Sequence, residues 1–392
     1  MYQLIYGSLK LNGEKMLTSR MRVSKALNHE ETDRPPADLG STCNTSITKI
    51  AYRNLRSHLG YPPENKPKFL SEEMQVVEVE DSILERLHID TVGVHANPPD
   101  VDRPDRFSED RFIDEWGIKY KAARSNGEVL YYDIEESPLA AVSTLKELEG
   151  YRWPDPDDPG RTRGLRERAA GLRESTDRVL VGHMGDTSIF QACTMIRGME
   201  QFLTDLLINK KIAHALLEKV LEIQSIKMEK FLEETGEYLD VVCIGDDYGG
   251  QSGLLISPAM FKQTIKPYLR SYFEIMKSKS PAKINLHSCG AIQDILADLI
   301  EIGVDIINPV QVSAAGMDPV MLKKRFGKEL SFWGGIDTQR ILPGKSPFQV
   351  TEETRRIAGI LGKGGGYVLN PVHNIQPDVP PENVVAVYDA FF

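Results

Sequence analysis

The sequence predicts a (β/α)8 barrel, the TIM-barrel fold, and three observations support this prediction. The chain has 392 residues, and such barrels span about 250 to more than 400 residues. Short β-branched segments alternate with helix-length amphipathic segments, which favours a parallel sheet. Eight such strand segments occur without a dinucleotide-binding glycine motif, so closure into a barrel is favoured.

The order of elements along the chain is expected to be simple. Residues 1–36 are predicted to form an arm and a helix, which begins near Thr18, carries Val23 and Leu27 on one face and ends before Pro35. The whole chain, 1–392, is expected to be a single barrel domain. The predicted strands are 37–41, 90–95, 178–184, 238–247, 283–289, 305–311, 330–335 and 367–373.

One segment interrupts this alternation after the second strand. Within residues 96–140, the stretches 111–120 and 127–132 are typical of an antiparallel hairpin, and Ser125-Asn126-Gly127 supplies the turn between them. Because the insertion follows the end of a barrel strand, we expect it to fold over the barrel mouth.

Composition excludes several classes of function. The formal net charge is −10, and without a basic run neither nucleic acid nor an anionic membrane is an expected partner. The sequence has no run of about 18 apolar residues and no signal-peptide pattern. Its four cysteines are widely spaced and do not suggest a disulfide framework. We therefore expect a cytoplasmic protein.

Polar and aromatic residues gather where the predicted strands end, which is the active-site face of such barrels. The candidates for substrate binding at these ends are His95, His183, Tyr248, Gln311 and Trp333. Either histidine could instead be a hydrogen-bonded strand-end residue. The aromatic residues, with Phe190, could line a flat apolar pocket or belong to the core.

The strongest signal is the pair His287 and Cys289 at the end of the fifth predicted strand. Residues two apart in a strand point to the same side, so imidazole and thiolate would both face the barrel axis. Zn²⁺ takes nitrogen and sulfur ligands of this kind, and His373 is the best third ligand, with a fourth position left open. The alternative is a buried cysteine beside a core histidine.

The adjacent acids Asp246 and Asp247 are the candidate catalytic residues. Neighbouring residues at a strand end point to opposite sides, so we expect one of them to reach the pocket. That carboxylate could orient a metal-bound histidine, bind the metal or handle a proton. A helix cap or a loop hydrogen bond is the structural alternative.

Several longer motifs carry a family resemblance. They are TSR at 18–20, DRPP at 33–36, GDDYG at 245–249, QSG at 251–253, ISP at 256–258, HSCG at 287–290, GGID at 334–337, GGGY at 364–367 and PPEN at 380–383. Together they make the chain similar to the uroporphyrinogen decarboxylase superfamily, over nearly its whole length. The resemblance also implies a barrel.

Two branches of that superfamily differ in their expected chemistry. True decarboxylases carry an arginine-rich segment near the first strand, whereas residues 37–46 here contain no arginine. The zinc-dependent corrinoid methyltransferases hold their metal with a His-x-Cys pair and a later cysteine. His287 and Cys289 match that pair, and His373 stands near the position of the later cysteine. The resemblance therefore implies the methyltransferase branch.

The histidine at this position indicates a particular use of the metal. Zinc with one thiolate and two neutral imidazoles keeps a net positive charge and suits a Lewis-acid role on an ether oxygen. The resemblance then implies methyl transfer from a methoxylated, in the first instance aromatic, substrate to Co(I) of a corrinoid. No Asp-x-His cobalt-binding motif occurs in the chain, so the cobalamin is expected on a separate corrinoid-binding protein.

Other interpretations stay open at this point. The chain could be a metal-free decarboxylase that uses Asp246 or Asp247, a methyl-corrinoid:thiol methyltransferase, or a barrel without catalysis. The expected partners are the corrinoid-binding protein and a small-molecule methyl donor, and a homodimer is also allowed.

Overall fold

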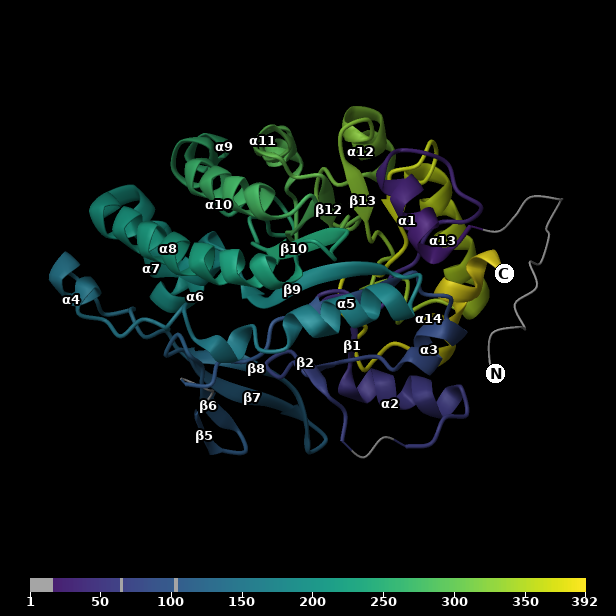
Figure 1. Cartoon of the computed structure of the whole chain (residues 1–392), viewed down its shortest axis with the longest axis horizontal. Helices are drawn as coiled ribbons and strands as arrows, with labels where there is room; N and C mark the ends of the chain where they lie inside the picture. Colours follow the sequence, from purple (N-terminus) through teal and green to yellow (C-terminus); the bar gives the residue numbers. More distant parts are fainter. Residues whose placement is uncertain (1–16, 64–65, 102–104) are drawn as a thin grey trace.

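The computed structural model describes residues 17–63, 66–101 and 105–392. A curled parallel sheet with the strand order β14-β13-β12-β11-β10-β9-β4 forms its centre. Helices surround this sheet, which confirms the predicted TIM-barrel-like α/β fold (Figure 1). The strands are β4 (Thr91–His95), β9 (Val179–Thr187), β10 (Val241–Gly245), β11 (Lys283–His287), β12 (Ile306–Asn308), β13 (Ser331–Trp333) and β14 (Tyr367–Val368).

The prediction of a full strand at 37–41 is wrong. Only its first residues bridge the two outer strands: Asp38 N–H donates to Leu369 O at 2.9 Å, and Asp90 N–H donates to Ala37 O at 2.8 Å. Beyond them the Asp38 carboxylate accepts the Ser41 N–H at 3.2 Å. This local bond turns the chain, as such side chains commonly do. The barrel therefore closes through a short bridge instead of a full strand.

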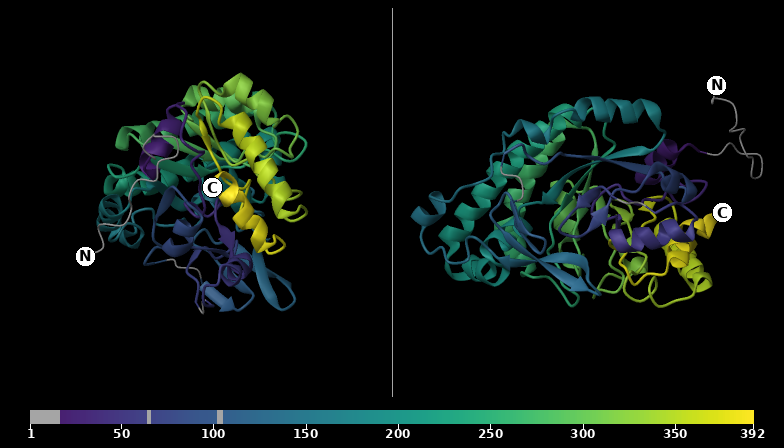
Figure 2. Two further views of the ribbon diagram at one scale, coloured as in Figure 1. Left: turned by 90° about the vertical axis from the view of Figure 1, so that its right-hand side faces the viewer. Right: turned by 90° about the horizontal axis from the view of Figure 1, so that it is seen from below.

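Two small antiparallel sheets lie outside the barrel. The larger has the order β5-β6-β7-β8. The predicted turn at Asn126-Gly127 joins β7 to β8, but the predicted strand at 111–120 is wrong: it is divided between β6 and β7, which pair with each other across a turn at 114–118. Figures 1 and 2 show this sheet on the side of the molecule opposite helices α9–α11. The strands are β1 (Ile47–Thr48), β2 (Phe69–Ser71), β3 (Val76–Val77), β5 (Asp105–Ser108), β6 (Arg111–Ile113), β7 (Lys119–Ser125) and β8 (Glu128–Glu136).

Helices connect the strands and cover the barrel. No helix among the described residues combines the length and apolar character needed to cross a bilayer. The α-helices are α1 (Ser19–Leu27), α2 (Lys49–His58), α3 (Asp81–Arg86), α4 (Leu145–Glu149), α5 (Leu165–Ser175), α6 (Phe190–Arg197), α7 (Met199–Ile208), α8 (Lys210–Thr235), α9 (Pro258–Met260), α10 (Lys266–Lys279), α11 (Leu296–Ile302), α12 (Pro319–Phe326), α13 (Pro347–Leu361) and α14 (Pro381–Tyr388).

Helix α1 covers the end of the barrel at which the strands begin, opposite the carboxyl ends of the strands. Thr18 caps it by accepting the Met21 N–H, as is typical of threonine at this position. Val23 and Leu27 are buried in one cluster with the inward-facing side chains of the strands, as predicted. Residues 1–16 of the predicted arm lie outside the described residues.

A buried ion network fixes α1 and the following loop to the barrel. Asp90, at the start of β4, is fully buried and accepts hydrogen bonds from Arg22 at 2.7 Å and Arg34 at 2.7 Å. Arg22 also donates to Asp33 at 2.7 Å. The DRPP motif is therefore explained by structure rather than by catalysis.

Removal of the Arg22 side chain should destabilise the fold strongly. A buried carboxylate that loses one ion-pair partner typically costs about 3–5 kcal/mol, and we expect about 3 kcal/mol for Arg22→Ala because Arg34 remains beside Asp90. Urea unfolding measures this loss. The control is Arg111→Ala, which removes an exposed pair with Glu135 and should cost less than about 1 kcal/mol. Equal losses in the two variants would contradict this account of the network.

Candidate metal centre

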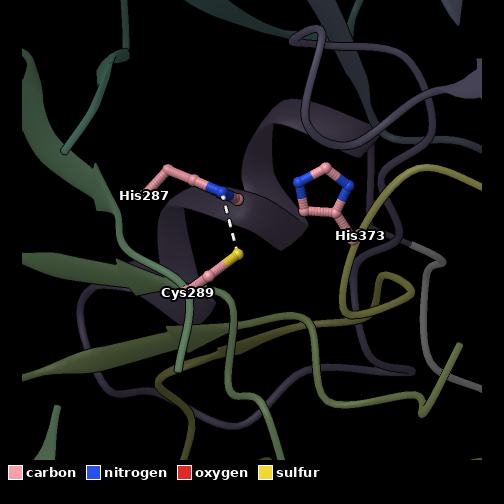
Figure 3. A group of neighbouring side chains, drawn as sticks. All are labelled: His287, Cys289 and His373. Atoms are coloured by element: carbon pink, nitrogen blue, oxygen red, sulfur yellow. Dashed lines mark hydrogen bonds between the residues drawn. The ribbon is translucent and has the colours of Figure 1, made fainter. Parts of the chain in front are cut away.

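Three side chains converge at the carboxyl ends of the strands. His287 ends β11, Cys289 follows it by two residues, and His373 comes from the loop after β14 (Figure 3). Their ligand atoms all lie within 4.8 Å of one another, and Cys289 Sγ is 3.5 Å from His287 Nε2. The structure thus brings together the three residues predicted as metal ligands.

A close glycine contact holds Cys289 in place. The strand ends at His287, earlier than predicted, and the chain turns after Cys289 at Gly290, where φ is +86°. A Cβ at Gly290 would lie 2.3 Å from the Gly249 backbone, and one at Gly249 would lie 2.9 Å from Cys289 O. The glycines of the GDDYG and HSCG motifs therefore allow two loops to touch and so position the thiol.

Asn308 at the end of β12 orients the His287 ring. The Asn308 side chain donates from Nδ2 to Trp333 O at 3.1 Å, which leaves Oδ1 facing His287 Nδ1 at 2.5 Å. Nδ1 must then carry the proton, so the lone pair lies on Nε2, the atom beside Cys289. Metal-binding histidines are commonly oriented by such a second hydrogen bond.

Burial sets the charge state of the three groups. It lowers the pKa of His373 to about 3 and also lowers the pKa of His287, so both imidazoles are neutral at pH 7. Burial raises the pKa of the Cys289 thiol well above its usual value, and the Asp247 carboxylate raises it further. A cation bound here would displace the thiol proton, which couples metal affinity to pH.

The donor set fits zinc. Zinc bonds to nitrogen and sulfur of about 2.1 and 2.3 Å at a tetrahedral angle place the two ligands roughly 3.5 Å apart, which is the separation of His287 Nε2 and Cys289 Sγ. Two neutral imidazoles and one thiolate leave a fourth position for another ligand. The residues present therefore fit a zinc ion.

A cavity of about 380 Å³ opens onto this group. Its strand end is formed by His183, Gly245, Asp247, His287 and His373. Its sheet end is formed by residues of the two small sheets and the β2–β3 turn: Ser71, Glu73, Met74, Asp114, Trp116, Ile118, Tyr120, Tyr132, Asp133 and Ile134. The inserted sheet thus covers the barrel mouth, as expected from the sequence.

The two adjacent acids separate as predicted, with one of them facing the cavity. Asp247 lines the cavity and accepts the Cys289 N–H at 2.7 Å. Asp246 is fully buried and accepts the N–H groups of Phe190 at 3.1 Å and Gln191 at 2.6 Å in the first turn of α6. Asp246 is therefore a helix cap, and its predicted catalytic role is corrected to a structural one.

The predicted substrate-binding histidines and glutamine have different positions. His183 lines the cavity, where its Nδ1 accepts the Gly185 N–H at 3.0 Å. His95 is packed over Gly93, and burial lowers its pKa to about 3; it does not line the cavity. Gln311 lines a second cavity of about 180 Å³, which Cys289 and His373 also line.

Tyr248 and Trp333 belong to the core, which corrects their prediction as substrate contacts. Both side chains are fully buried. The Tyr248 hydroxyl donates to Asp246 at 2.5 Å, with its ring packed against Phe190. Trp333 fills the barrel interior and donates from Nε1 to Asp38 at 2.9 Å. Both residues do follow strands as predicted, but their side chains are buried in the core and not in the cavity.

Sequence reasoning missed the sheet end of the cavity. Trp116, Ile118 and Tyr120 recur at every second position of the sequence, but only Tyr120 lies on a strand, β7, while Trp116 and Ile118 lie in the turn between β6 and β7. Tyr132 comes from the neighbouring strand β8, and its ring meets the buried Phe112 edge-to-face at 5.1 Å. These rings form an aromatic wall opposite the metal centre.

Asp114, on this wall, has an unusual pKa. Burial is the largest cause and, together with the carboxylates of Glu73 and Glu115, raises the pKa to about 7 against the hydrogen bonds from Ile118 and Tyr120, which lower it. The usual value is 3.8, so the unfolded chain loses this proton first as the pH rises. Between about pH 4 and pH 7 the group therefore lowers the free energy of unfolding with rising pH.

This titration predicts a pH-dependent effect of Asp114→Asn. The variant keeps an acceptor for Ile118 but cannot ionise, so it should unfold at higher urea than the wild type at pH 8 and at similar urea at pH 4.5. Asp110→Asn is the control, because Asp110 is an exposed partner of Arg124 on the same sheet. A variant that gains no stability relative to the wild type between these two pH values would contradict the raised pKa.

Comparison with known proteins decides the family. The model of the family described as uroporphyrinogen decarboxylase (URO-D) matches residues 105–391, well over half of the chain. This chain belongs to the uroporphyrinogen decarboxylase family. The uroporphyrinogen decarboxylase of Legionella pneumophila (strain Paris) is 26% identical over 206 residues, which cover 51% of this chain and 54% of that protein. The chain therefore spans about half the length of this relative.

Two further comparisons extend the match. The uroporphyrinogen decarboxylase of Pseudomonas aeruginosa is 25% identical over 281 residues, covering 67% of this URO-D family member and 73% of that protein. Among solved structures, a methyltransferase from Methanosarcina mazei covers 96% of this chain and 98% of its own, with a TM-score of 0.64 and 19% identity. The predicted superfamily and barrel are thus confirmed, and the comparison with the methyltransferase structure shows a shared fold.

Proposed function

We propose that this URO-D family member is a zinc-dependent methyltransferase that moves a methyl group from a methoxylated substrate, in the first instance an aromatic one, to Co(I) of a separate corrinoid protein. The observation that carries the proposal is the convergence of His287, Cys289 and His373, of which His287 and His373 line one end of the cavity beneath the inserted sheet. The shared barrel with the Methanosarcina mazei methyltransferase supports it.

The proposed reaction forms one bond and breaks another, and residues of the site have a role in it. The Co(I) electron pair forms the cobalt–carbon bond, the carbon–oxygen bond of the ether breaks, and the oxygen keeps the electron pair of that broken bond as phenolate or alkoxide. Zinc held by the three ligands would supply Lewis acidity toward this leaving oxygen. Asn308 keeps His287 Nε2 available, Asp247 holds the Cys289 backbone, and the inserted sheet restricts water around the reacting atoms.

A decarboxylase that acts on a polycarboxylate is the rival suggested by the names of the relatives. Such a substrate would need cationic partners, yet no Lys or Arg occurs among the described residues that line the cavity. The lining instead includes Glu73, Asp114, Asp133 and Asp247. Because carboxylates repel carboxylates in a partly buried site, this charge distribution favours methyl transfer over decarboxylation of a porphyrinogen.

The proposal is tested with a Co(I) corrinoid protein and methoxybenzenes, following methyl-cobalt formation by absorbance. We expect one demethylated phenol for each methyl-cobalt formed, and no turnover by Cys289→Ala. The control Cys193→Ala removes a buried thiol from α6 that lines neither cavity and should retain activity. Turnover with thiols or methylamines alone would contradict the ether substrate.

A further inference from the structure

The cavity has two chemically different ends. At the strand end, His287, His373 and Asp247 line the cavity and would face the reacting atoms. At the sheet end, Trp116, Tyr120 and Tyr132 supply aromatic surface beside Glu73 and Asp114. A substrate that reaches the metal centre from this cavity must therefore present its other end to aromatic rings and carboxylates.

The carboxylates at the sheet end lack a cationic partner on the cavity wall. Asp114 is held by the Ile118 N–H at 2.8 Å and the Tyr120 hydroxyl at 3.3 Å, and Glu73 accepts the Ser71 hydroxyl at 3.0 Å. Both sets of donors are neutral. No Lys or Arg lines the cavity in the part of the chain that the structure describes.

Two cationic side chains near this wall form ion pairs outside the cavity. Lys227 Nζ lies 5.2 Å from the Trp116 ring centroid, but it pairs with Glu115 at 2.9 Å and does not line the cavity. Arg161 pairs with the same Glu115. Burial together with Glu73 and Glu115 raises the pKa of Asp114, as expected where negative charge awaits compensation.

Aromatic faces combined with carboxylates are the chemistry that binds an ammonium group. Phe112, which does not line the cavity, stacks on Tyr120 with ring centroids 4.8 Å apart and so supports this ring from behind. A carboxylated methoxyarene would meet repulsion at this end, and a neutral one would leave the charges unpaired.

We infer that the methyl donor is a methoxylated compound with a protonated or quaternary amine at the end distant from the metal centre, where Glu73, Asp114 and the aromatic wall receive it. This inference rests on the proposed function for the reacting end of the molecule, whereas the amine end rests on the lining of the cavity alone.

Calorimetric titration of the purified protein with three matched probes tests the inference. Homoveratrylamine carries the ammonium group, homoveratrate carries a carboxylate on the same ring, and veratrole is the neutral core. We expect the amine to bind at least about tenfold more tightly than veratrole, and homoveratrate no more tightly than veratrole. Equal or tighter binding of homoveratrate or veratrole would overturn the inference.

Variants locate the amine site. Asp114→Asn and Glu73→Gln should each lower the affinity for homoveratrylamine by about tenfold and leave the affinity for veratrole unchanged. Asp110→Asn should change neither affinity. Either variant alone suffices if the other fails to fold. An unchanged amine affinity in a folded Asp114→Asn or Glu73→Gln variant would overturn the assignment.

Zinc content of the same samples separates the two proposals. Zinc near one equivalent per chain with equal binding of all three probes overturns the amine inference alone. Selective amine binding by a protein that takes up no zinc overturns the proposed function and leaves the amine site standing.

Discussion

Cys289→Ala should lower the zinc content of the purified protein from about one equivalent per chain to well below it. The variant removes the only sulfur donor of the three, and the two remaining imidazoles make a much weaker site for a borderline-soft ion. Elemental analysis after dialysis against a weak chelator measures the change. Methyl transfer should fall with zinc content, because both depend on the same group.

Cys193→Ala supplies the matched control for this loss. It deletes a thiol of the same size from a fully buried position in α6, so any fall in folding yield appears there as well. Retained zinc in Cys289→Ala, or an equal loss in Cys193→Ala, would show that the thiol of Cys289 is not a ligand.

Asn308→Leu should weaken zinc affinity by about 10–100-fold while all three ligands stay in the chain. Partners that orient a metal-bound histidine typically contribute an effect of this size. The leucine cannot accept the His287 Nδ1 proton, so the ring loses the bond that directs Nε2 toward Cys289. Competition with a chromophoric chelator at fixed pH measures the affinity, since metal binding releases a proton here.

A second buried asparagine separates this effect from general destabilisation. Asn383 donates to Leu342 O and Lys345 O, each at 2.8 Å, and lines neither cavity. Asn383→Leu should therefore cost stability without changing zinc affinity. If both variants lower the zinc affinity equally, the orienting role assigned to Asn308 is wrong.

The sequence predicted those features that depend on local periodicity. The helix predicted to begin near Thr18 with Val23 and Leu27 on one face corresponds to α1. The pair His287 and Cys289 was predicted to share one side by the two-residue strand repeat. His373 required only that parallel strands end at one face of the barrel.

Side-chain direction at a strand end could not be predicted in the same way. Asp246 and Asp247 are adjacent, and only the packing of α6 decides which of them caps that helix. Tyr248 and Trp333 also follow strands, yet the core and the barrel interior take up their rings. Periodicity ends where the strand ends, so these positions depend on tertiary contacts.

The sheet end of the cavity depends on contacts between distant segments. The turn at Asn126-Gly127 predicted a hairpin, but nothing in the sequence indicates that this hairpin contacts the β2–β3 turn. A backbone hydrogen bond from Tyr132 N–H to Glu73 O, 2.7 Å long, joins them. This contact brings Glu73 and the aromatic wall together, and only the folded chain shows it.

The central claim is that His287, Cys289 and His373 form one zinc site, and anomalous scattering at the zinc edge from crystals of the purified protein tests it most directly. The account predicts one strong peak per chain between His287 Nε2, Cys289 Sγ and the His373 ring, at distances of about 2.0–2.3 Å. A zinc-supplemented crystal with no peak at this position, or with its zinc bound elsewhere, would contradict the account.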